Sequence, residues 1–128
     1  MPKVHQEVKF AAPPAKVYQA LMSSAEHTQF TGAPAQIAKE EGGAWSAYGG
    51  MISGRHIELV DGVRIVQSWR AGNWAAGAHS LVRFEFKPDG VGTLVVLDHD
   101  ALTDEQAPHI DEGWAKMYWT PLRKFLEG

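Results

Sequence analysis

The sequence predicts an α+β fold in which a curved antiparallel sheet wraps around one long C-terminal helix. Three observations indicate this class: two short helical segments follow the first strand, glycine-punctuated strand patterns fill residues 42–99, and an apolar stripe at helical spacing runs through residues 104–127. The chain has 128 residues, of which 45% are hydrophobic and 21% charged. We therefore expect a single domain over residues 1–128 with one hydrophobic core.

The N-terminal part predicts one strand and two helices. Residues 4–10 alternate apolar and polar side chains, as a half-buried strand does. Two prolines at 13–14 end this strand, and residues 15–22 follow with apolar side chains at helical spacing. The serines at 23–24 can end that helix and cap a second one over residues 25–30.

Residues 42–99 predict strands and hairpins. Glycine pairs at 42–43 and 49–50 bracket a short strand, AWSAY. Residues 81–86 and 92–99 predict a hairpin joined by a glycine-containing turn. Its inward side chains are expected to be Val82, Phe84 and Phe86 on one strand and Thr93, Val95, Leu97 and His99 on the other.

A second hairpin is centred on Asp61-Gly62, and two loop lengths compete for it. A two-residue loop places Glu58 opposite Ile65, which mixes polar and apolar faces. A three-residue loop over residues 60–62, with Gly62 left-handed, instead pairs Ile57 with Ile65 on one apolar face. We choose the three-residue loop.

The chain ends in one long amphipathic helix. Pro121 lacks an N–H group and crowds the carbonyl of Met117, so we expect a kink there. The apolar stripe that packs on the sheet consists of Ile110, Trp114, Met117, Tyr118, Leu122 and Phe125.

Composition excludes several classes of function. A formal net charge of −3 and the lack of any Lys/Arg run argue against nucleic acid as a partner. The chain has no cysteine, which excludes disulfides, thiolate catalysis and cysteine-based zinc sites. No segment has the apolar length of a signal peptide or a membrane span, so we expect a cytoplasmic protein without a membrane partner. No cofactor motif is present either.

The residues GGAW, YGGMISG, ELV, RIVQSWR, TLVVLDH and GW follow one another in an order and spacing that resemble a known family. The resemblance is to the domain of the Hsp-90 ATPase activator homologues, and it runs from about Phe30 to Phe125. These proteins belong to the START-like superfamily. The resemblance implies a helix-grip (START-like, Bet v-like) fold, with a cavity between the sheet and the C-terminal helix.

The resemblance also implies a partner, a chaperone of the Hsp-90 class. Eukaryotic activators of this family carry a second, N-terminal domain that binds the chaperone's middle segment. We expect a chain of 128 residues to contain at most half of that mechanism.

The patterns point to a ligand cavity, because a curved sheet diverges from a straight helix and leaves a gap. The chosen register places Arg55 opposite Gln67 on the apolar face, where they could orient a carboxylate or carbonyl; an alternative is that the register is wrong. The aromatic residues could equally be ordinary core packing. The predicted cavity residues are Arg55, Gln67, Trp69, Phe84, His99, Trp114 and Tyr118.

Trp74 follows the strand that carries Trp69, and we interpret it as a partner surface. If Trp74 is exposed, a homodimer is also expected. The six histidines show no zinc-binding spacing, so no metal site is predicted. His99 points inward and is either a satisfied core histidine or a catalytic base.

Three functions follow in order of preference. The first is a non-enzymatic START-like domain that binds a small hydrophobic or amphipathic molecule in the cavity. The second is a co-chaperone-like module that binds an Hsp-90 class chaperone through its surface. The third is a cyclase- or hydratase-type enzyme that uses His99 or Arg55.

Overall fold

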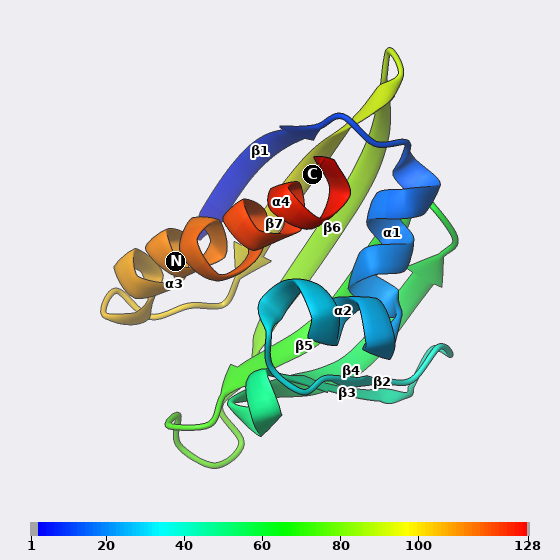
Figure 1. The fold of residues 1–128 in the computed structure, drawn as a ribbon. Coiled ribbons are helices and arrows are strands. Elements are labelled where there is room, and N and C mark those ends of the chain that lie inside the picture. Colours follow the sequence, from blue (N-terminus) through cyan, green and yellow to red (C-terminus); the bar gives the residue numbers. More distant parts are fainter. Residues whose placement is uncertain (1–2, 128) are drawn as a thin grey trace.

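Seven strands form one antiparallel sheet in the order β1-β7-β6-β5-β4-β3-β2, as seen in a computed structural model that describes residues 3–127 (Figure 1). The strands are β1 (Val4–Phe10), β2 (Gln36–Ile37), β3 (Ala44–Ala47), β4 (Ile52–Val60), β5 (Arg64–Ala71), β6 (Ser80–Asp89) and β7 (Gly92–Asp100). The helices are α1 (Pro14–Met22), α2 (Ser24–Thr31), the short η1 (Tyr48–Gly50), α3 (Gln106–Trp114), the π-helical η2 (Ala115–Trp119) and α4 (Thr120–Glu127).

The helices lie on one face of the sheet. Figure 1 shows α3 and α4 crossing that face as one rod, with α1 and α2 beside it. The core between these two layers holds Trp114 and Leu122 from the rod and Val82 and Phe84 from the sheet. The predicted α+β class and its helix-grip form are confirmed.

The first helices begin and end as their sequence predicts. Pro14 occupies the first turn of α1. The side chain of Ser23 accepts a hydrogen bond from the N–H of Glu26 at 3.2 Å and caps α2. Gly32 ends α2 in the left-handed conformation, with φ of 77°.

The β6–β7 hairpin has the predicted pairing. Val82 lies opposite His99, Phe84 opposite Leu97, and Phe86 opposite Val95. These inward-facing side chains are buried. The predicted inward faces of both strands are therefore confirmed, although alternation is clear along β6 alone, because residues 94–97 of β7 are all apolar.

The β4–β5 hairpin corrects the predicted register. The loop has three residues and a left-handed Gly62, but it spans residues 61–63, so Leu59 lies opposite Ile65. A β-bulge at Ile57, between His56 and Glu58, then shifts the register back by one residue. As a result Ile57 is 54% exposed, and His56, not Arg55, lies opposite Gln67.

Pro121 predicted a kink in the C-terminal rod, and the structure has a π-helical turn, η2, just before this proline. The N–H of Thr120 bonds to the carbonyl of Ala115, which is the i to i+5 pattern of a π-helix. The wider turn inserts one residue into the apolar stripe. Trp119 is buried in consequence, whereas Met117, which we predicted to pack on the sheet, is 40% exposed.

Candidate functional site

An apolar cleft of about 150 Å³ opens at one end of the grip, between the sheet and the C-terminal rod. Its walls contain almost no polar surface. We call it the mouth cleft. Its lining comprises Tyr48, Met51, Ile52 and Trp69 from the sheet side, and His109, Ile110, Gly113, Trp114, Met117 and Tyr118 from the helix side.

Tyr48 joins the two walls of the mouth cleft. It begins a left-handed turn in which Tyr48, Gly49 and Gly50 have φ of 52°, 66° and 93°. The Tyr48 hydroxyl donates a hydrogen bond to the carbonyl of Met117. Pro121 has no N–H with which to satisfy that carbonyl in an α-helix, so the tyrosine replaces the missing donor.

A second, smaller space lies deeper in the grip. We call it the inner void; its volume is about 20 Å³, close to that of one water molecule. Its lining comprises Leu21, His27, Ile37, Trp45, His56, Ile65, Gln67, Phe84, Trp114 and Tyr118. Trp114 and Tyr118 line both the inner void and the mouth cleft.

Two histidines of the inner void are neutral. Burial lowers the pKa of His27 to about 4 and also lowers the pKa of His56. His27 Nε2 lies 3.1 Å from the hydroxyl of Tyr118, and burial raises the pKa of that hydroxyl. The sequence analysis missed both histidines, because uninterrupted alternation along β4 points His56 outward and nothing marks His27.

His99 lies in a chain of hydrogen bonds that runs from Trp114 to the carbonyl of Trp69. Trp114 Nε1–H donates to His99 Nδ1 at 3.1 Å, and His99 Nε2–H donates to the Ser80 hydroxyl at 2.7 Å. That hydroxyl donates onward to the carbonyl of Trp69 at 3.0 Å. Burial lowers the pKa of His99 to about 3. Both ring nitrogens are engaged, so His99 ties the helix to the sheet and has no nitrogen free to act as a base.

The structure separates the predicted cavity residues into groups. Trp69 lines the mouth cleft, Gln67 and Phe84 line the inner void, and Trp114 and Tyr118 line both. His99 is buried beside Trp69 and Trp114 without lining either space.

Arg55 requires a correction. It is exposed, and its Nη1 donates to the carbonyl of Gly42 at 3.0 Å. The bulge at Ile57 reverses the face on which Arg55 was expected. The spaces inside the grip therefore have no cation among their lining residues.

Trp74 is half-buried. Its ring lies 5.4 Å from that of Trp69, and its carbonyl accepts a hydrogen bond from Arg70 Nη2 at 2.7 Å. The loop after β5 is thereby anchored to the core. A partner-binding role for Trp74 stays a prediction.

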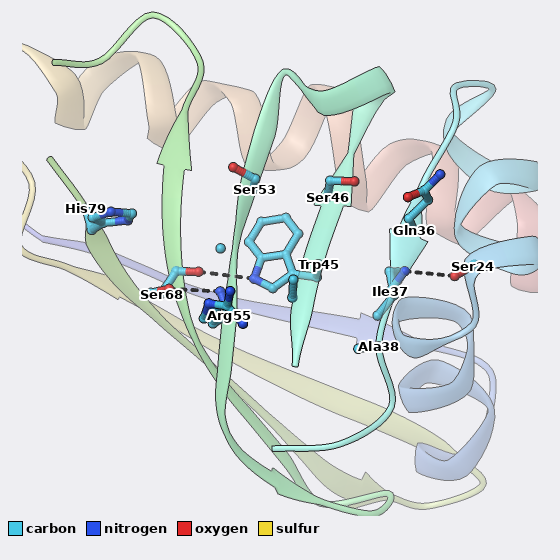
Figure 2. A pocket seen from close by; sticks show the side chains of 12 residues that line it. Ser24, Gln36, Ile37, Ala38, Trp45, Ser46, Ser53, Arg55, Ser68 and His79 are labelled. Carbon is cyan, nitrogen blue, oxygen red and sulfur yellow. Dashed lines mark hydrogen bonds between the residues drawn. The ribbon is translucent and has the colours of Figure 1, made fainter. Parts of the chain in front are cut away.

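An open groove of about 920 Å³ lies against strands β2 to β5 (Figure 2). Ser46, Ser53 and Ser68 line it together with Arg55. Trp45 Nε1–H donates to the carbonyl of Ser68 at 3.1 Å, and the Ser68 hydroxyl accepts from the N–H of Arg55 at 2.9 Å. These contacts occupy a distorted part of the β4–β5 ladder.

Neither a metal centre nor a membrane span emerges from residues 3–127. No group of three or more potential ligands among them is arranged to hold a metal ion. None of their helices is both long enough and apolar enough to cross a bilayer.

A family model described as "Activator of Hsp90 ATPase homolog 1-like protein" matches residues 11–127. The chain belongs to this family. It is 32% identical over 109 residues to an activator of 90 kDa heat shock protein ATPase homolog from Dictyostelium discoideum, covering 84% of this chain and 28% of that protein. It is 28% identical over 99 residues to homolog 2 from Mus musculus, covering 77% and 30%. The chain thus spans less than a third of the length of these relatives.

Solved structures of members and relatives share the fold. An HSP90 activator from Plasmodium falciparum superposes with a TM-score of 0.89 at 20% identity, covering 98% of this chain and 96% of that one. A dimeric Aha1 from Colwellia psychrerythraea superposes with a TM-score of 0.82 at 20% identity, covering 99% and 97%. At this level of identity the likeness concerns the fold.

Proposed function

We propose that this Aha1-like domain is a co-chaperone-like module that binds a chaperone of the Hsp-90 class. The mouth cleft would accept one apolar side chain of that chaperone. Membership of the activator family and the names of its relatives support the identity of the partner. A cytoplasmic location and a homodimer stay predictions.

The volume of the mouth cleft carries this proposal. Pockets for drug-sized molecules usually enclose about 300–1,000 Å³. The mouth cleft has about 150 Å³, which suits a single aromatic or leucine side chain. A protein partner needs only such an anchor, because the surrounding surface supplies the rest of the contact.

The rim of the mouth cleft is suited to a protein surface. Met51 is 69% exposed and Met117 is 40% exposed, so two flexible apolar side chains flank the opening. Methionine adapts its shape to different partners because its side chain is unbranched and polarizable.

A pair of charge substitutions tests the proposal. Met51→Arg places a cation at the rim and should weaken binding to the purified Hsp-90 class chaperone at least 10-fold, or about 1.4 kcal/mol. Val91→Arg is the matched control, since Val91 is also an exposed apolar residue but lies at the tip of the β6–β7 hairpin. Isothermal titration calorimetry and the chaperone's ATPase rate provide the readouts. Equal affinities for the two variants would refute the role of the mouth cleft.

A second candidate function is the binding of a small apolar molecule in the same cleft. The nearly apolar lining favours it, and the volume limits such a molecule to about one aromatic ring. Native mass spectrometry of gently purified protein, beside a denatured control, tests this function. A mass that denaturation releases supports it and identifies the molecule by its size.

The third hypothesis, an enzyme, loses the two residues on which it depended. His99 has both nitrogens in structural hydrogen bonds, and Arg55 lies outside the grip. These contacts support our preference for a binding function over an enzyme.

A further inference from the structure

The inner void is surrounded by polar atoms that lack partners. His27 is 3% exposed and His56 is 2% exposed. His27 Nδ1 and both ring nitrogens of His56 form no hydrogen bond within residues 3–127. Leaving a buried donor or acceptor unpaired costs about 1–3 kcal/mol, so a polar group placed beside these atoms would be stabilised.

The surroundings of the inner void specify the chemistry of that group. Its volume of about 20 Å³ accommodates one oxygen-sized group. None of the lining residues is Asp, Glu, Lys or Arg. A charged group would be buried without a counter-charge, which is very costly, whereas a hydroxyl both donates and accepts as the imidazoles and the Gln67 amide require.

The inner void and the mouth cleft are separated by shared walls. Trp114 and Tyr118 line both spaces, and their rings lie 4.9 Å apart. The two spaces are therefore adjacent, with the apolar one at the opening of the grip and the more polar one at its inner end.

We propose that the inner void binds the uncharged hydroxyl of a small aromatic alcohol whose ring occupies the mouth cleft. This inference rests on the second candidate function, the binding of a small molecule. It adds a polar recognition site, formed by His27, His56 and Gln67, to an otherwise apolar cleft. A water molecule is the competing source of the same hydroxyl chemistry.

Calorimetric titration with phenol and with benzene separates these two sources. Both rings fit about 150 Å³, but only phenol carries a hydroxyl. We expect phenol to bind at least 10-fold more tightly than benzene. In an entirely apolar site the order would reverse, because the hydroxyl would lose its hydrogen bonds to water.

Gln67→Met tests whether the hydroxyl of bound phenol lies beside the amide of Gln67. This substitution keeps the side-chain length and removes the amide, so phenol should lose its 10-fold advantage while the affinity for benzene stays the same. Gln67→Leu serves as a second variant if the first folds poorly. Gln36→Met is the control, since Gln36 is exposed on β2 and lines only the open groove.

The other outcomes overturn the inference in different ways. Benzene binding without a phenol preference would mean that the inner void holds only water. A phenol preference that survives both Gln67 variants would place the hydroxyl elsewhere, for example at the unpaired Nε1–H of Trp69. If neither molecule binds, the small-molecule function fails together with the inference, whereas the chaperone proposal is tested separately.

Discussion

The two halves of the sheet differ in regularity. Strands β1, β7 and β6 pair without interruption, and every inward residue of β6–β7 lies where simple alternation predicts. Strands β5, β4 and β3 contain a bulge, a distorted ladder and the left-handed turn at Tyr48. Both internal spaces involve the irregular half. The comparison indicates that the internal spaces occur where the strands depart from regular pairing.

The largest expected effect concerns Gly54 in the irregular half. A Cβ atom at Gly54 would collide with the carbonyl oxygen of Ser68 and with Nε1 of Trp45. Gly54→Ala should therefore lower the free energy of unfolding by about 3 kcal/mol or more, as measured by urea denaturation. Gly77→Ala is the control: its Cβ meets no atom within 4 Å, and only the cost of its positive φ, about 1 kcal/mol, is expected. Equal losses would show that crowding at Gly54 is unimportant.

Low pH should destabilise the protein, because buried histidines in both halves of the sheet's core must then take up protons. His27 borders the inner void and His99 lies on β7, and their folded-state pKa values of about 4 and about 3 lie below the unfolded value of 6.5. Because the unfolded state binds more protons, this stability is present above pH 6.5 and is lost as pH falls toward 4 and 3. Between pH 7.5 and 5.5 each histidine should contribute a loss of about 1.4 kcal/mol.

Urea denaturation at several pH values checks this expectation. His5 acts in the opposite direction, since hydrogen bonds to Asp98 and Glu7 raise its pKa, and His5→Gln removes that opposing contribution. His27→Phe should reduce the pH dependence, because one of the three buried histidines with a lowered pKa (His27, His56 and His99) is gone. A stability profile that is flat from pH 7.5 to 5.5 would contradict neutral, buried histidines.

Tyr48→Phe tests how much the hydrogen bond between the Tyr48 hydroxyl and the Met117 carbonyl contributes to stability. Without the hydroxyl, the Met117 carbonyl loses its donor, and the free energy of unfolding should fall by about 1–1.5 kcal/mol. Tyr18→Phe is the control in the other half, where Tyr18 packs on Phe86 through its ring edge. A loss for Tyr18→Phe as large as for Tyr48→Phe would remove the distinction between the two hydroxyls.

The smallest effect should be a gain in stability. Gly113 lies within α3 and lines the mouth cleft, and a Cβ atom there meets nothing within 4 Å. Gly113→Ala should stabilise the helix by about 0.5–1 kcal/mol in thermal or urea unfolding. The same methyl group narrows the mouth cleft, so benzene binding should weaken. A gain in stability without weaker benzene binding would mean that Gly113 does not set the width of the mouth cleft.

Residue patterns were enough to predict the fold class, most of the elements in their order and the inward faces of the β6–β7 hairpin. They also located the disturbance at Pro121. These features depend on local rules: alternation along a strand, helical spacing, caps, and the missing N–H of proline.

The two positions where one residue is inserted could not be predicted from these patterns and are seen in the folded chain alone. The bulge at Ile57 turns His56 inward and Arg55 outward, and the π-helical turn exchanges Met117 for Trp119 in the core. An inserted residue moves every neighbouring side chain to another face, but it leaves no periodic signal of its own. Contacts between segments distant in sequence accompany each insertion: Trp45 with Ser68 across Gly54, and Tyr48 with Met117.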